Sequence, residues 1–197
     1  MTITNKEIYQ IYSRSYSITE SRGKERQNTI NDTIINILTK KEEYKDCDFK
    51  TETRMYEDIS WGQYFTVDIQ VWKDGKLIEI ILAKAPASNI LQNHVNGLNA
   101  RAGELLRLGK YGLKGVKITF FTFQPNKCPY FTSNGLIKHF ENTTVEGISE
   151  VREFITFDFR QVTVTFDING IEKCSNREDV KKMLMNEEVI NNIQVHI

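Results

Sequence analysis

Several features that would define a protein class are scarce in this chain. It contains three cysteines and three prolines in 197 residues. The cysteines are widely spaced and form no C-x-x-C pair, which argues against a disulfide framework or structural zinc site and favours a reducing compartment. No apolar run approaches the roughly 20 residues of a membrane span, and the first residues contain no apolar signal core. We therefore expect a soluble, cytoplasmic protein.

The charge balance and the missing motifs exclude further classes. The formal net charge is +0, whereas proteins that coat nucleic acid non-specifically are usually basic. The patterns G-x-x-x-x-G-K-[ST], G-x-G-x-x-G and G-x-S-x-G are absent, so nucleotide-binding folds and serine hydrolases lose their main support. What remains is an ordinary globular composition, with 40% hydrophobic and 26% charged residues, and a length that suits one domain.

Hydrophobic patterning predicts an alternation of helices and strands. Apolar residues at helical spacing define two amphipathic helices, and β-rich runs define the strands. The pair Asp74-Gly75 between two such runs is typical of a tight hairpin, because its turn needs positive φ at both central residues. The predicted elements are a helix (24–43), strands (48–56, 64–73 and 76–84), a helix (88–109) and a strand (116–123).

The C-terminal part continues with more strands. Runs over 154–159 and 162–168 predict strands, Asn169-Gly170 predicts a turn, and a capping box over 175–178 predicts a helix reaching about 188. The strand–helix–strand order before this part predicts a parallel crossover. We therefore expect an α/β fold with a central mixed β-sheet flanked by helices. We expect one domain over 1–197, with a core at about 25–124 and a C-terminal extension at about 148–197.

Two acidic residues lie inside the apolar strands of the hairpin. If Lys73 pairs with Lys76, then Gln70 lies opposite Glu79, and Asp68 and Glu79 share one face with Cα atoms roughly 7–8 Å apart. Carboxylates at that separation can bind one Mg²⁺, and the cation removes the cost of burying them. Alternatively, each acid pairs with an Arg or Lys, or faces solvent.

The order of elements and the acidic pair resemble the core of the PD-(D/E)XK nucleases, which include many type II restriction endonucleases. In that family an Asp is followed on the next strand by an acid-x-Lys motif; here Asp68 precedes Glu79-Ile80-Ile81 by ten residues. The resemblance covers about 25–124. It implies that Asp68, Glu79 and the backbone carbonyl of Ile80 bind Mg²⁺, which activates water for attack on a DNA phosphate.

The sequence departs from the family at one important position. Ile81 stands where the family has the lysine that orients or activates the attacking water. Gln70 could position water but supplies no positive charge. Three interpretations stay open: the site is an impaired variant, the cation comes from Lys84 or the following helix, or the resemblance is misleading. A further acid often comes from the first helix or strand of the family, for which the candidates are Glu25, Glu42 and Glu52.

The helix after the hairpin carries a polar face suited to reading base edges, although it could also be an ordinary solvated face. Its candidate DNA-binding residues are Gln92, Asn93, His94, Asn96, Asn99 and Arg101. The leading hypothesis is a Mg²⁺-dependent endonuclease that cuts double-stranded DNA as a homodimer. Its activity would be reduced if no other residue replaces the lysine expected at position 81. The alternatives are a non-catalytic nuclease-fold protein that binds DNA or a protein partner and an RNA-directed nuclease with its lysine on the helix. No lysine occurs between 85 and 109, which counts against the last.

Overall fold

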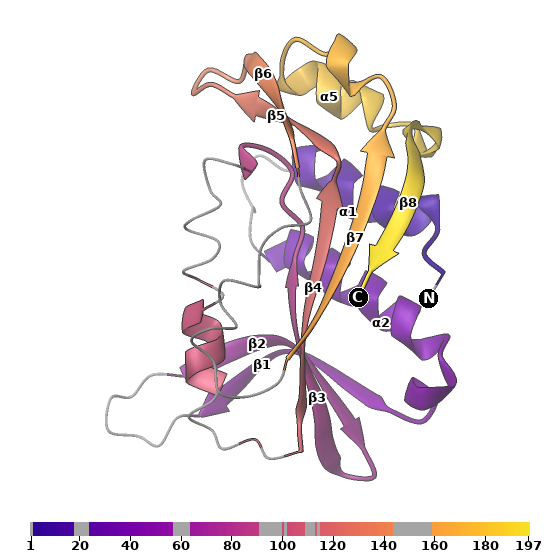
Figure 1. The fold of residues 1–197 in the computed structure, drawn as a ribbon, viewed down its shortest axis with the longest axis vertical. Helices are drawn as coiled ribbons and strands as arrows, with labels where there is room; N and C mark the ends of the chain where they lie inside the picture. Colours follow the sequence, from indigo (N-terminus) through magenta and orange to yellow (C-terminus); the bar gives the residue numbers. More distant parts are fainter. Residues whose placement is uncertain are drawn as a thin grey trace.

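The computed structural model describes residues 2–17, 24–56, 64–90, 100, 102–108, 113, 115–143 and 159–197. It is an α/β structure built on a central sheet (Figure 1). Its helices and strands are α1 (Asn5–Ser17), α2 (Lys24–Thr39), β1 (Asp48–Tyr56), β2 (Tyr64–Lys73), β3 (Lys76–Lys84), β4 (Lys117–Pro125), β5 (Lys127–Phe131), β6 (Ile137–Asn142), β7 (Arg160–Ile168), α5 (Arg177–Met183) and β8 (Ile190–His196).

The central sheet is mixed, as the sequence predicts. Its order is β1-β2-β3-β4-β7-β8, and among the described strands β5 and β6 pair with each other in a separate two-stranded sheet. The first three strands are antiparallel, β4 and β7 run parallel to β3, and β8 closes the edge in antiparallel orientation. The parallel β3–β4 step confirms the predicted crossover, and helical residues 102–108 lie in the chain between these two strands.

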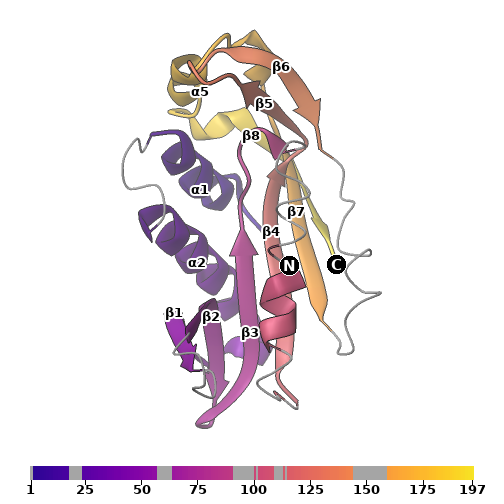
Figure 2. The same cartoon turned by 90° about the vertical axis from the view of Figure 1, so that its left-hand side faces the viewer.

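Apolar side chains are buried on both faces of the sheet. Helices α1 and α2 cover one face (Figure 2) and contribute Ile8, Ile34 and Leu38 to the larger core. On the other face, Leu105 and Leu108 pack with residues of β3 and β4. Burial on both faces explains why β3 is almost entirely apolar, so Glu79 in its interior requires specific partners.

Elements outside the predicted core differ more from expectation. Helix α1 and the strands β5, β6 and β8 were not predicted. The last helix ends at Met183 rather than near 188, and its N-cap is Asn176, whose side chain accepts a hydrogen bond from the Asp179 N–H. Most of the predicted strand over 154–159 lies outside the described residues.

The register of the β2–β3 hairpin is the main correction. Lys73 pairs with Lys76 as predicted, but a β-bulge follows, so that Val71 pairs with Glu79, and Gln70 pairs with Ile80. Paired residues share a face and successive residues alternate. The predicted pairing of Gln70 with Glu79 is therefore wrong, and these two side chains lie on opposite faces of the hairpin.

Candidate active site

Glu79 is held in a buried polar cluster, in which hydroxyl donors and cations surround both of its carboxylate oxygens. Its side chain is 2% exposed. The Tyr44 hydroxyl, from the 3-10 turn Glu42–Tyr44, donates a 2.6 Å hydrogen bond to Oε2, and the Thr119 hydroxyl donates to Oε1. Burial and the adjacent carboxylate raise the pKa of Tyr44, so its hydroxyl stays protonated and remains a donor.

Two cations complete the surroundings of Glu79. Arg160 Nη2 lies 3.6 Å from Oε1, and Lys117 Nζ lies 4.0 Å from Oε2. Arg160 belongs to β7 and Lys117 to β4, so Glu79 joins three strands to the turn after α2. A carboxylate with two hydroxyl donors and two cations has its charge and lone pairs satisfied by the protein itself.

Asp68 has different neighbours. Its Oδ2 accepts a 2.7 Å hydrogen bond from the backbone N–H of Ala83, where the β2–β3 ladder has already ended at Ile69 and Ile81. Burial raises the pKa of Asp68 to about 6, against the lowering effects of this hydrogen bond and of Lys84. The charges of Glu104 and Glu52 raise the pKa further. The hydrogen bond from Ala83 and the charge of Lys84 therefore do not offset the cost of burying the Asp68 carboxylate.

Lys84 and Glu104 lie beside Asp68 on neighbouring elements. Lys84 ends β3, Glu104 belongs to helical residues 102–108, and their charged atoms are 3.4 Å apart. Glu104 Oε2 is buried and has no hydrogen-bond partner among the residues that the structure describes, an arrangement that is costly unless a further ligand is bound. Asp68, Lys84 and Glu104 are called the acidic site below.

Helix α2 supports the acidic site from the opposite side of β2. The fully buried Asn31 donates from Nδ2 to the backbone carbonyl of Asp68 at 3.2 Å and to Glu52 Oε1 at 3.4 Å. Arg26 Nη2 donates to the carbonyl of Ala85, one residue after Lys84. Glu52 itself has a φ of 49°, uncommon for a non-glycine residue. Side chains from α2 thus hold the backbone at Asp68 and directly after Lys84.

The predicted metal pair is not brought together. The partners of Glu79 (Tyr44, Thr119, Lys117 and Arg160) and the groups around Asp68 have no residue in common. Asp68 remains a candidate ligand, whereas Glu79 is engaged elsewhere. Among the residues that the structure describes, no three His, Cys, Asp or Glu side chains are close enough to hold a metal ion. A Mg²⁺ ion needs fewer protein ligands, because it keeps water and takes phosphate oxygens as well.

The other predicted site residues occupy varied positions. Ile81 is 1% exposed and packs in the core beneath α1 and α2, on the Glu79 face of the hairpin. Ile80 is buried on the opposite face. Gln70 is also buried, and its Oε1 accepts a 3.0 Å hydrogen bond from Trp72 Nε1. The candidate DNA-binding residues Gln92, Asn93, His94, Asn96, Asn99 and Arg101 lie outside the described residues.

Sequence reasoning missed Glu104 and assigned Lys84 only a conditional role. One signal for Glu104 was available: it is the single acidic residue between residues 85 and 140. Lys84 was assigned to the face opposite Asp68 because the bulge was not foreseen. The bulge shifts the pairing by one residue. Beyond it, each residue of β2 shares a face with the set of β3 residues that was predicted for the opposite face.

The described helices include none with the length and apolarity to cross a bilayer. No protein-family model, no curated protein and no solved structure matches the chain.

Proposed function

We propose that the protein is a Mg²⁺-dependent endonuclease that cuts double-stranded DNA, with Asp68, Glu104 and Lys84 as its catalytic groups. The observation that carries the proposal is the acidic site itself, where a partly buried Asp68 lies near an oxygen of Glu104 that has no hydrogen-bond partner among the described residues. The site lies in a core with the element order α2, β1, β2, β3, helical residues 102–108 and β4. That order supports the resemblance to the PD-(D/E)XK nucleases.

Each residue of the acidic site has a defined task in this proposal. Asp68 Oδ1 and Glu104 Oε2 would bind Mg²⁺, since neither atom accepts a hydrogen bond from the described residues. Bound there, Mg²⁺ supplies charge stabilisation at the attacked phosphate. The Lys84 ammonium would hold the attacking water and stabilise negative charge on the phosphate oxygens. Lys84 thereby replaces the lysine missing at Ile81, and Glu104 replaces Glu79.

A second candidate is a non-catalytic protein with the same fold that binds DNA or a protein partner. Lys84 favours it, because this lysine is ion-paired with Glu104 at 3.4 Å rather than directed at an open metal site. The two candidates share a fold and differ in whether the acidic site binds a divalent cation. A cleavage assay therefore separates them.

The test is cleavage of supercoiled plasmid with Mg²⁺ or with EDTA. We expect Mg²⁺-dependent cutting by the wild type and a loss of about 100-fold or more in Lys84→Ala and in Glu104→Gln. Glu43→Gln is the matched control, because Glu43 is exposed in the turn after α2 and its ion pair with Lys41 lies outside the acidic site. Unchanged cutting by both acidic-site variants would refute this assignment, and no cutting by the wild type would favour the binding protein.

The same gel tests the proposed homodimer. A dimer with two acidic sites cuts both strands in one encounter and produces linear plasmid. A monomer with one site produces nicked circles first, so prolonged accumulation of nicked circles would contradict the dimer.

A further inference from the structure

Strands β5 and β6 form a two-stranded ribbon that is separate from the central sheet in the described part of the chain. Tyr130 and His139 are paired across the ribbon and stack, with ring centroids 4.7 Å apart and ring planes at 14°. The other pair on this face, Cys128 and Glu141, is buried. The His139 side chain is 50% exposed, so the face opens to solvent at the stacked pair.

The ribbon is fixed to the chain that leaves the acidic site. Five residues after Lys84, Asn89 forms three hydrogen bonds with the backbone of β5. Its Nδ2 donates to the Phe131 carbonyl at 3.0 Å, its Oδ1 accepts from the Phe131 N–H at 2.9 Å, and its own N–H donates to the Pro129 carbonyl at 3.1 Å. These three bonds fix the ribbon relative to the end of β3. The ribbon and helical residues 102–108 lie on the same side of the molecule, away from α1 and α2 (Figures 1 and 2).

The start of α5 is packed against the turn that joins β5 to β6. The Arg177 N–H donates to the Gly135 carbonyl, the Ile137 N–H donates to the Ser175 carbonyl, and the Arg177 guanidinium stacks on Phe131 at 4.6 Å. These contacts, together with the ion pair between Lys127 of β5 and Glu172, make the ribbon, α5 and the turn Ile171–Lys173 one unit. The ribbon is therefore a rigid projection, which favours recognition of a shaped surface.

Two lysines of this unit carry positive charge that no ion pair in the described structure compensates, and the one acid on the open face is Glu141, 3.8 Å from His139. Lys138 on β6 and Lys173 are exposed, and neither forms an ion pair with any residue that the structure describes. The exposed acids of the unit are already engaged: Glu172 pairs with Lys127, and Glu178 pairs with Lys181. A polyanion can therefore approach Lys138 and Lys173 without displacing an ion-pair partner from either.

We propose that the β5–β6 ribbon is a DNA-docking element that enters the major groove of a duplex. The groove admits a two-stranded β-ribbon, Lys138 and Lys173 contact the flanking phosphates, and Tyr130 and His139 present hydrogen-bonding groups to the base edges. The inference rests on the proposed function for its choice of ligand. In this proposal the ribbon positions the duplex against the acidic site. Asn89 holds the ribbon in place relative to that site.

The test is binding of a fluorescein-labelled duplex of about two helical turns, followed by anisotropy at several salt concentrations without divalent metal. For Lys138→Ala/Lys173→Ala we expect affinity to fall about 10-fold and the slope of log affinity against log salt to decrease by about 2, because each lost phosphate contact removes about 0.9. His139→Ala should instead leave the slope unchanged and reduce the difference in affinity between unrelated duplex sequences.

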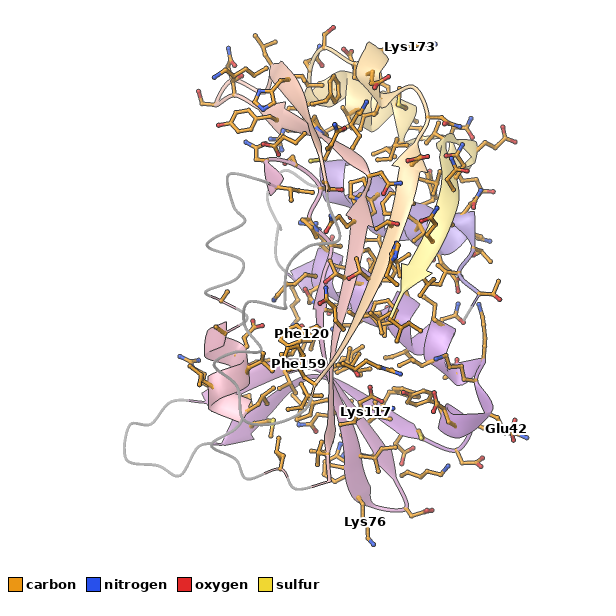
Figure 3. All side chains as sticks on the ribbon, viewed as in Figure 1. Glu42, Lys76, Lys117, Phe120, Phe159 and Lys173 are labelled. Carbon is orange, nitrogen blue, oxygen red and sulfur yellow. The ribbon has the colours of Figure 1, made fainter. Side chains whose placement is uncertain are left out.

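Lys6→Ala/Lys76→Ala is the matched control, since it removes the same charge from two other exposed lysines. Lys76 lies at the opposite end of the molecule from Lys173 (Figure 3). We expect this control to bind the duplex like the wild type. Equal losses in the two double variants would show a non-specific charge effect and overturn the inference.

The outcomes separate the ribbon from the nuclease proposal. Ribbon-dependent binding without Mg²⁺-dependent cleavage would support the ribbon and refute the nuclease. Cleavage with binding that is unaffected by the ribbon variants would support the nuclease and refute the ribbon. Absence of duplex binding, or ribbon-dependent binding that is tighter for single-stranded RNA of equal length, would also refute the proposed ligand.

Discussion

Replacing Asp68 by Asn should stabilise the metal-free protein at neutral pH while abolishing its proposed activity. The substitution removes the charge but retains an acceptor, because an Asn Oδ1 can still receive the hydrogen bond from the Ala83 N–H. Burial penalises the carboxylate of the wild type and raises its pKa to about 6. Opposite effects on stability and on activity are characteristic of a charged group held in place for function.

The size of the effect follows from the pKa of Asp68. A rise from 3.8 to about 6, at about 1.4 kcal/mol per pH unit, gives a penalty of at most about 3 kcal/mol. Because the side chain is only partly buried, solvent screening reduces this to about 1–3 kcal/mol. Between about pH 4 and 6 the folded state binds more protons at Asp68 than the unfolded chain, so the free energy of unfolding attributable to this group falls as pH rises.

The assay is urea unfolding of wild type and Asp68→Asn in EDTA at about pH 4 and at about pH 7.5, which bracket the titration. We expect the variant to be more stable by about 1–3 kcal/mol at the higher pH and nearly equal to the wild type at the lower pH. Adding Mg²⁺ should stabilise the wild type and not the variant. A variant that is less stable than the wild type at the higher pH would refute the charge penalty on which the acidic site depends.

Two further substitutions distinguish the acidic site from the residues that the sequence pattern favoured. Glu79→Gln leaves Arg160 and Lys117 beside a neutral amide and should destabilise the protein by about 1–3 kcal/mol, discounted because both cations are partly exposed. Its cleavage activity per folded molecule, measured with active protein quantified by circular dichroism, should match the wild type; a complete loss would return Glu79 to the catalytic set. Ile81→Lys places an ammonium in the core beneath α1 and α2 and should lower the free energy of unfolding by about 3 kcal/mol or more. Plasmid cutting should not increase in that variant, and a gain of cutting would show that position 81 faces the reacting phosphate.

Local signals in the sequence were sufficient to locate the central hairpin. The predicted bounds of β1, β2 and β3 coincide with the observed strands. Asp74 and Gly75 have φ values of 51° and 73°, as the turn requires, and fix where β2 ends and β3 begins. The helix-spaced apolar residues of α2 likewise identify the face that packs on the sheet. These features depend on interactions between near neighbours in the chain, so their residue pattern predicts them.

The β-bulge could not be predicted from the same signals. Pairing follows the turn for two residues on each strand and then shifts, leaving Ile78 without a partner between Leu77 and Glu79. Nothing in the local sequence marks this position, such as a glycine suited to a bulge. The shift places Glu79 within reach of Tyr44, Thr119 and Arg160, which are distant in the sequence. Long-range polar contacts therefore favour the register that was observed.

Electrostatic balance explains why one acid of the hairpin is structural and the other is a candidate for catalysis. Glu79 has one negative charge and two neighbouring cations, so a metal ion would meet net positive charge there. Around Asp68, the charges with the largest effects on its pKa after burial are Lys84, Glu104 and Glu52. Three carboxylates against one ammonium leave a deficit of two positive charges, which a divalent cation matches. Any cation site of this hairpin should therefore include Asp68 and exclude Glu79, although both acids lie in strands of similar apolarity.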